Sequence, residues 1–270
     1  MQLPVSGFEV QFRVPTGSDD MALAETGGNA VESGLTALSR LALLCGDAML
    51  DLPRSSAWSL WKGLSLTDFD FALLSLRRFL FGDRMLCVFR CPSNQCGNRM
   101  ATEFSISALL DQVKPKTSAQ AIPIPERKGW FKLHTVANEE LVFRLPTVED
   151  QIEVIGRKDP DKLLAERCLE STRPRARELV RVERAMEMLA PLVSRSLESA
   201  CADCGQQLAM QLHVPTLVMG EMCAAALAVH DDVDAIAEAY HWDEATILAM
   251  PQRRRCAYAE TIRRHRGAAL

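Results

Sequence analysis

The chain has 270 residues, of which 48% are hydrophobic and 24% charged, and its formal net charge at pH 7 is −4. These values are typical of a globular protein with one large domain or two small ones, and they exclude a chain that is disordered throughout. The net acidity also argues against a surface that follows nucleic acid over its whole length, although arginines gather near the C-terminus.

Neither a targeting signal nor a membrane span is predicted. Residues 1–12 lack the basic segment and long apolar core of a signal peptide. The most apolar later stretch, Leu217–Val229, is interrupted by Glu221 and is shorter than the roughly 20 residues that cross a bilayer. We therefore expect a cytoplasmic protein without membrane contact, in a compartment that keeps thiols reduced.

The first predicted element is a short strand that leads into a capped helix. The segment Phe12–Asp19 reads F-R-V-P-T-G-S-D, and Phe143–Asp150 repeats the pattern as F-R-L-P-T-V-E-D. In each copy the threonine hydroxyl can accept from an unpaired backbone N–H, and the aspartate three positions later stands where a capping-box carboxylate would. Helix capping is therefore favoured over a functional role for the arginine and the aspartate.

Four longer segments have distinct patterns. Asp19–Ser33, rich in glycine and acidic residues, is expected to be a loop or a frayed helix start. Thr67–Phe81 is dense in leucine and phenylalanine and predicts a helix that is buried on most sides. Lys114–Lys128 carries three prolines and predicts a linker, whereas Arg175–Glu198 has the apolar spacing of an amphipathic helix.

The nine cysteines include two close pairs, Cys91-x4-Cys96 and Cys201-x2-Cys204, and a glycine follows each pair. In a reducing compartment such pairs indicate metal or redox chemistry rather than disulfides. Two such turns predict a zinc-ribbon-like site in which these four thiolates hold one structural Zn²⁺. Cys87 lies in the same strand-like run as Cys91 and is the reserve ligand.

A strand is predicted after each cysteine pair. Met100–Ile106 and Leu208–Val214 alternate apolar residues with polar or small ones, which is the pattern of a half-buried strand. The order strand, capped helix, further helices, cysteine turn and strand thus occurs twice. We interpret this order as an internal duplication.

No catalytic residue and no small-molecule substrate are predicted. The sequence contains no Gly-rich phosphate loop, no H-E-x-x-H and no G-x-S-x-G pattern. A redox C-x-x-C at Cys201 and Cys204 is the main alternative to a metal site, but no βαβ pattern surrounds it.

From Thr216 onward the chain is expected to be helical, with breaks near Asp231-Asp232 and at Pro251. An aromatic turn capped by Asp243 separates two short helices, and a basic helix ends the chain. Trp, Tyr and Arg dominate the energetics of protein interfaces. The predicted partner-binding residues are therefore Tyr240, Trp242, Arg253, Arg254 and Arg255. The alternative for the arginines is a solvated helix face, and nucleic-acid binding is the weaker option.

These features together resemble the T4-type baseplate hub assembly proteins, a chaperone family of contractile-tailed phages and related contractile injection systems. The resemblance rests on the F-R-x-P-T-x-x-D segments, the cysteine pairs and the ending Tyr-His-Trp…Ile-Leu-x-Met-Pro…Arg-Arg. It implies a non-catalytic assembly factor or minor structural component whose partners are baseplate hub or spike proteins. It also implies a location in the cytoplasm of the bacterial host or producing cell.

The expected fold is α+β and predominantly helical. Units 1–114 and 115–215 each contain a strand, helices, a cysteine turn and a strand; the four-cysteine site joins them, and 216–270 forms a helical C-terminal segment. Two other functions stay open. The first is a free-standing zinc-ribbon module that binds protein or nucleic acid; binding of nucleic acid would need a basic sheet face. The second is a C-x-x-C thiol oxidoreductase, which would need one cysteine of low pKa.

Overall fold

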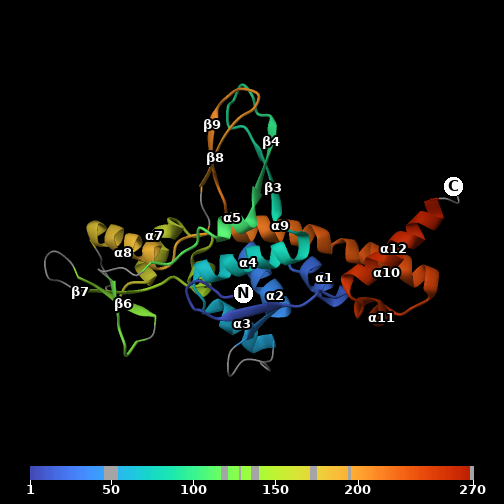
Figure 1. Ribbon diagram of the computed structural model, residues 1–270, viewed down its shortest axis with the longest axis horizontal. Helices are drawn as coiled ribbons and strands as arrows, with labels where there is room; N and C mark the ends of the chain where they lie inside the picture. Colours follow the sequence, from blue (N-terminus) through green and yellow to red (C-terminus); the bar gives the residue numbers. More distant parts are fainter. Residues whose placement is uncertain are drawn as a thin grey trace.

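The computed structural model describes residues 1–45, 54–116, 121–127, 129–134, 140–170, 175–193 and 196–267. They form a mixed α+β fold in which a helical body extends along the longest axis and two hairpins rise from it (Figure 1). The strands are β1 (Glu9–Phe12), β2 (Ala42–Cys45), β3 (Arg84–Arg90), β4 (Arg99–Ser105), β5 (Ala121–Pro123), β6 (Trp130–His134), β7 (Glu140–Arg144), β8 (Ser196–Ala200) and β9 (Gln207–Gln211). The helices are α1 (Gly17–Ala24), α2 (Ala30–Leu41), α3 (Arg54–Lys62), α4 (Leu66–Phe81), α5 (Ile106–Leu110), α6 (Val148–Val154), α7 (Pro160–Arg167), α8 (Ala176–Leu189), α9 (Val214–Ala226), α10 (Ala228–Tyr240), α11 (Glu244–Leu248) and α12 (Gln252–Gly267). The predicted α+β class is confirmed.

The described strands form small antiparallel sheets in the orders β1–β2, β3–β4, β5–β6–β7 and β8–β9. Antiparallel neighbours in sequence need only a short turn between them. The pairs β3–β4 and β8–β9 are such hairpins, and their turns hold the paired cysteines. Both hairpins leave the same side of the body and meet at their tips (Figure 1).

Among the described residues, the buried apolar side chains of the body form three separate groups. The largest lies between α2, α4 and α9 and includes Leu38, Phe69 and Val218. A second, which includes Phe143, lies between the sheet β5–β6–β7 and α8, and a third, which includes Ile236, lies between the C-terminal helices. The boundary predicted at residue 216 falls inside α9, which packs into the largest core.

Helix α4 confirms the helix predicted over Thr67–Phe81. It begins after Ser65, whose hydroxyl accepts from the backbone N–H of Asp68 at 3.1 Å. It ends at Gly82, whose φ of +90° is a conformation that glycine adopts without a side-chain clash. Phe69 and three leucines of α4 are buried in the largest core and stabilise the helix, whereas Phe79 and Phe81 near its end are exposed.

The predicted capping role of the two Pro-Thr segments is also confirmed. The carboxylates of Asp19 and Asp150 accept from the backbone N–H of Thr16 and Thr147 at 2.9 and 3.0 Å. Each carboxylate also accepts two hydrogen bonds from the arginine of its own segment: Arg13 at 2.7 and 2.7 Å, and Arg144 at 2.5 and 2.7 Å. The repeated Arg and Asp therefore hold the strand end against the helix start in both places.

Each Pro-Thr segment also binds the start of a distant helix through two backbone hydrogen bonds. The first segment binds the start of α12, and the second binds the start of α4. The hydrogen bonds are Gly17 N to Met250 O (3.2 Å) and Gln252 N to Pro15 O (3.0 Å) in the first, and Val148 N to Leu64 O (3.1 Å) and Leu66 N to Pro146 O (3.2 Å) in the second. The two segments therefore make equivalent contacts. The first joins the C-terminal helices to the N-terminal segment, and the second joins α4 to the middle of the chain.

Two expectations about helices are wrong. Asp19–Ser33 is mostly helical, because Thr16 starts α1 and Asn29 caps α2 by accepting from two backbone N–H groups; only the region around the two glycines between them is irregular. The break expected near Asp231-Asp232 lies instead at Leu227. Helix α10 runs through both aspartates because Asp232 is buried against arginines.

Other boundaries differ as well. The helix predicted over Arg175–Glu198 ends at Leu189, ahead of Pro191, and its last predicted residues belong to β8. The predicted strands end earlier than expected, because Ile106 and Val214 begin helices. Part of the predicted linker forms the short edge strand β5, while residues 117–120 and 128 lie outside the described part. No described helix is both long and apolar enough to cross a membrane.

Candidate metal centre

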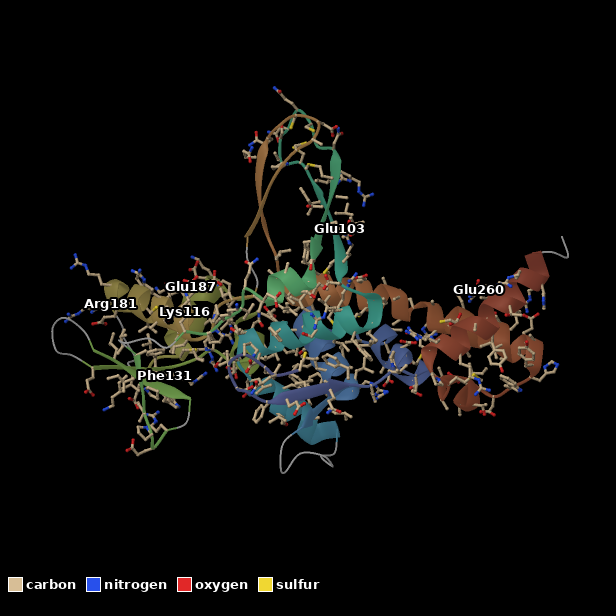
Figure 2. The ribbon with its side chains drawn as sticks, viewed as in Figure 1. Glu103, Lys116, Phe131, Arg181, Glu187 and Glu260 are labelled. Carbon is tan, nitrogen blue, oxygen red and sulfur yellow. The ribbon has the colours of Figure 1, made fainter. Side chains whose placement is uncertain are left out.

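The first hairpin carries Cys91 directly after β3 and Cys96 in the turn before β4. The backbone N–H of Cys91 donates to the carbonyl of Asn98 at 2.9 Å, which extends the pairing of the strands to the cysteine. Gly97 follows with φ of +61°, a left-handed conformation that reverses the chain beside the second sulfur. The sulfur atoms gather at the tip of the hairpins (Figure 2).

The second hairpin repeats this geometry with a shorter turn. The backbone N–H of Cys201 donates to the carbonyl of Gln206 at 2.9 Å, and Gly205 donates back to the carbonyl of Cys201 at 2.8 Å. Gly205 has φ of +72° and occupies the place that glycine has in the first turn. Both turns therefore direct two sulfurs toward the space between the hairpins.

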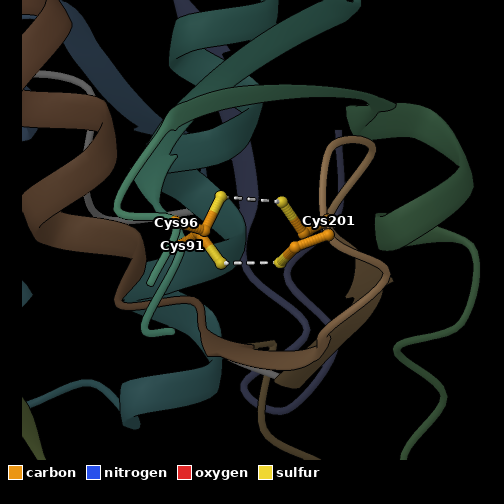
Figure 3. Close-up of side chains that lie close together, drawn as sticks. Cys91, Cys96 and Cys201 are labelled. Carbon is orange, nitrogen blue, oxygen red and sulfur yellow. Dashed lines mark hydrogen bonds between the residues drawn. The ribbon is translucent and has the colours of Figure 1, made fainter. Parts of the chain in front are cut away.

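The four predicted ligands lie together in the structure. The sulfurs of Cys91, Cys96, Cys201 and Cys204 all lie within 4.8 Å of one another. The sulfurs of Cys91 and Cys204 are 3.6 Å apart and those of Cys96 and Cys201 are 3.8 Å apart, so each close pair joins the two hairpins (Figure 3). Such a group of thiols is compatible with a metal site.

The surroundings of the cluster are partly closed. Cys91 and Cys201 are buried, Cys96 is half-buried, and Cys204 is exposed. Phe89 and Met100 of the first hairpin pack against the buried sulfurs. A second contact joins the two turns, since the Asn98 amide donates to the Asp203 carboxylate at 3.0 Å.

Backbone N–H groups of the turns point at the sulfurs. The N–H of Cys204, and then that of Asp203, donate to the sulfur of Cys201 and lower the pKa of that thiol to about 7. The N–H of Ser93 donates to Cys91, but burial and the neighbouring thiols outweigh it and raise the pKa of Cys91 to about 12. N–H groups in both turns therefore lie where they stabilise thiolates.

Cys87, the reserve ligand, is not part of the cluster. Its side chain is buried in the largest core, on the face of β3 that points to the body. Burial raises the pKa of its thiol, and the nearby Glu221 carboxylate acts in the same direction. Cys87 therefore behaves as a small apolar core residue.

The predicted partner residues separate into two groups. Tyr240 and Trp242 stack with ring centroids 5.0 Å apart, and Tyr240 is 41% exposed. Arg253 and Arg254 are exposed as well. The prediction for Arg255 is wrong, because this side chain is only 2% exposed and cannot contribute to a binding surface.

The reason is a buried ion-pair network that the sequence pattern did not reveal. Arg255 donates to Asp20 at 2.6 Å and to Asp232 at 3.1 Å, and Asp232 also accepts from Arg263 at 2.8 Å. Asp20 lies in the first turn of α1, so its partner could not be inferred from local spacing.

Comparison of the chain with protein-family models, with curated proteins and with solved structures found no match.

Proposed function

We propose that this chain is a non-catalytic assembly factor or minor structural component of the baseplate hub of a contractile tail or injection system. One structural Zn²⁺, held by Cys91, Cys96, Cys201 and Cys204, joins its two hairpins. The cluster of four sulfurs is the observation that supports the metal, and the resemblance described above supports the assembly role.

The spacing of the sulfurs supports a tetrahedral four-thiolate metal site. Zinc binds thiolates at about 2.3 Å, so the edges of a tetrahedron of four sulfurs are about 3.8 Å long. The distances of 3.6 and 3.8 Å between the close sulfur pairs agree with this length. Zinc accepts all-sulfur tetrahedral coordination and needs no redox partner, and four protein ligands leave no position for a substrate.

The parallel order of elements supports the internal duplication. In each half a strand leads through Arg-x-Pro-Thr into a capped helix, further helices follow, and a hairpin with two cysteines is succeeded by a helix. The two Pro-Thr segments also use the same pair of backbone hydrogen bonds. A duplicated chain that holds one metal between its halves contributes one hairpin from each.

Two exposed surfaces support a role in binding other proteins. On the outer face of the first hairpin, Leu86 and Val88 are 63% and 54% exposed. At the end of the body, Tyr240 is 41% exposed, and Arg254 lies over the Tyr258 ring that contacts Tyr240; Arg253 is the exposed neighbour of Arg254 on α12. Exposed apolar side chains beside arginines are typical of protein contacts. Baseplate hub or spike proteins are the proposed partners.

Metal analysis tests the zinc proposal. The purified protein is expected to contain about one equivalent of zinc, and replacement by Co²⁺ is expected to give the absorption bands of tetrahedral thiolate coordination. Cys204→Ser should lose the metal, whereas the control Cys256→Ser should keep it. Protein without zinc, or equal zinc in both variants, would contradict the proposal.

Particle imaging tests the assembly role. Cells that make the contractile particle are given the gene with Cys204→Ser or with Arg253→Glu and Arg254→Glu, and the particles are examined by electron microscopy. Missing or incomplete baseplates are expected; normal particles from both variants would contradict the assembly role.

Thiol titration distinguishes the assembly role from a thiol oxidoreductase, because rapid reaction of Cys201 in the metal-loaded protein would favour the oxidoreductase.

A further inference from the structure

A pocket of about 250 Å³ lies where α7, α8 and the start of α4 meet. Its walls are mostly apolar and are formed by Leu66, Pro146, Leu164, Met186, Ala190 and Leu192. Leu192 is 51% exposed at its edge. An open apolar pocket of this kind favours an occupant with a large apolar side chain.

The rim of this pocket is acidic. Asp161, Glu183 and Glu187 line it, and all three are exposed. Glu183 and Glu187 lie one turn apart on α8, so their charges repel each other. No ion pair joins these carboxylates to another residue in the described part of the chain. A cation beside the apolar occupant would therefore be attracted to the rim.

A surface that is complementary to this acidic, apolar pocket lies at the other end of the molecule. Tyr240 projects from a group of three aromatic rings, with Trp242 stacked on it and Tyr258 edge-on to both. Arg254 lies over the Tyr258 ring, and α12 as a whole carries six arginines and one glutamate. We call Tyr240, Trp242, Arg253 and Arg254 the aromatic–arginine surface.

Nearby carboxylates do not cancel this charge pattern completely. Glu238 already pairs with Arg266 at 2.7 Å, and Asp243 caps α11 by accepting from the N–H of Thr246 at 2.8 Å. Arg253 and Arg254 have no ion-pair partner among the described residues. The exposed Tyr240 ring, and the Arg254 guanidinium over the adjacent Tyr258 ring, have the chemistry that the apolar walls and the acidic rim require.

We propose that the acidic pocket of one copy binds the aromatic–arginine surface of a second copy. The pocket's helices and α12 lie at opposite ends of the long axis, as the positions of Glu187 and Glu260 show (Figure 2). A contact between two different surfaces joins subunits head to tail and generates a ring or an open chain. The role of this contact rests on the proposed assembly function, but the contact itself is a property of the purified protein.

Sedimentation of the purified, metal-loaded protein tests the inference. The weight-average mass is expected to rise with protein concentration at low salt, past the mass of a dimer. Added salt should lower it again, because exposed charges are screened beyond about 8 Å at physiological ionic strength. A monomer at every soluble concentration in low salt would overturn the inference.

Charge reversal identifies the two surfaces. The pocket variant carries Glu183→Lys and Glu187→Lys, and the surface variant carries Arg253→Glu and Arg254→Glu. Each is expected to be monomeric alone. A mixture of the two should associate again, since one intact pocket and one intact aromatic–arginine surface remain between them and the reversed charges of the two altered surfaces are themselves complementary.

A control carries Glu9→Lys and Glu126→Lys, which change the net charge as the pocket variant does and line neither surface. It should associate like the parent, and thermal unfolding should show that all variants are folded. Association of the pocket variant like the parent, or no association in the mixture, would overturn the inference. Particle assembly that depends on the arginines while the protein stays monomeric would overturn the inference and leave the proposed assembly function intact.

Discussion

The guanidinium of Arg255 lies 2.6 Å from the carboxylate of Asp20, a residue 235 positions earlier in the chain. Both side chains are buried, and Asp232 accepts a second hydrogen bond from the same guanidinium. This contact lies next to the backbone hydrogen bonds between Pro15–Gly17 and the start of α12. The C-terminal helices are therefore an integral part of the body, joined to it at the first turn of α1.

Arg255→Ala is expected to lower the free energy of unfolding by about 3–5 kcal/mol, because it leaves Asp20 and Asp232 buried without their shared partner. Arg254→Ala, the exposed neighbour, should change it by less than about 0.5 kcal/mol. Urea unfolding followed by circular dichroism measures both. Equal stability of the two variants would show that Arg255 is not buried as described.

Gly17→Ala should loosen the junction between α1 and the C-terminal helices. A Cβ atom at Gly17 would lie 2.8 Å from the Cα of Leu248 and 2.9 Å from Arg255, so the backbone would have to move. Crowding of this kind costs about 1–3 kcal/mol. Gly220→Ala in α9 meets open space and should instead stabilise the protein by about 0.5–1 kcal/mol, since alanine favours helix more than glycine. Thermal unfolding of both variants distinguishes these effects.

Removal of the metal should unfold the two cysteine hairpins and leave the body folded. The cysteines pack with Phe89 and Met100 in a group separate from the largest core, in which α4 lies. Hydrogen exchange with and without chelator measures the effect: amides of 85–105 and 196–211 should exchange faster, and those of α4 should not change. Equal loss of protection in α4 would show that the metal holds the whole chain.

Acid should reduce the contribution of Asp150 to stability. Burial alone would raise its pKa, but hydrogen bonds from Arg144 and Thr147 lower it to about 2. A carboxylate with a lowered pKa stabilises the fold above its ordinary pKa and loses this effect as the pH falls toward 2. Asp150→Asn should therefore cost about 2 kcal/mol near pH 6 and almost nothing near pH 2.

Urea unfolding midpoints at several pH values test this dependence. The control Asp231→Asn, at an exposed position of α10, should match the parent at each pH. A cost of Asp150→Asn that stays constant from pH 6 to pH 2 would contradict the role of its charge. The opposite sign is expected for Asp20, because burial raises the pKa of that carboxyl.

Features that depend on neighbouring residues were predictable from the sequence. The density of leucine and phenylalanine predicted α4, and Pro-Thr with an aspartate three positions later predicted two helix starts. The cysteine pairs are local patterns too, and the matching glycine turns indicated that both pairs contribute to one site. In each case the physical cause acts within a few residues of the signal.

Features that depend on distant partners were not predictable. The burial of Arg255 requires Asp20 from the opposite end of the chain, and an arginine run by itself resembles an exposed helix face. The end of β7 was predicted at Phe143, but the other two strands of its sheet were missed; β5 is short and contains Pro123, a residue that disfavours strands. The glycines of Asp19–Ser33 predicted a loop or a frayed helix start, whereas capping by Thr16 and Asn29 starts two helices there.

The separation of the two cysteine hairpins in sequence has a consequence for synthesis of the protein. Cys201 lies 105 positions after Cys96, so a ribosome adding roughly 5–20 residues per second makes the second hairpin about 5–20 s after the first. During that interval the nascent chain offers only two of the four thiols. Loading of the proposed metal would therefore wait until the second hairpin has been made, and a truncated product stopped before this hairpin would carry an incomplete site.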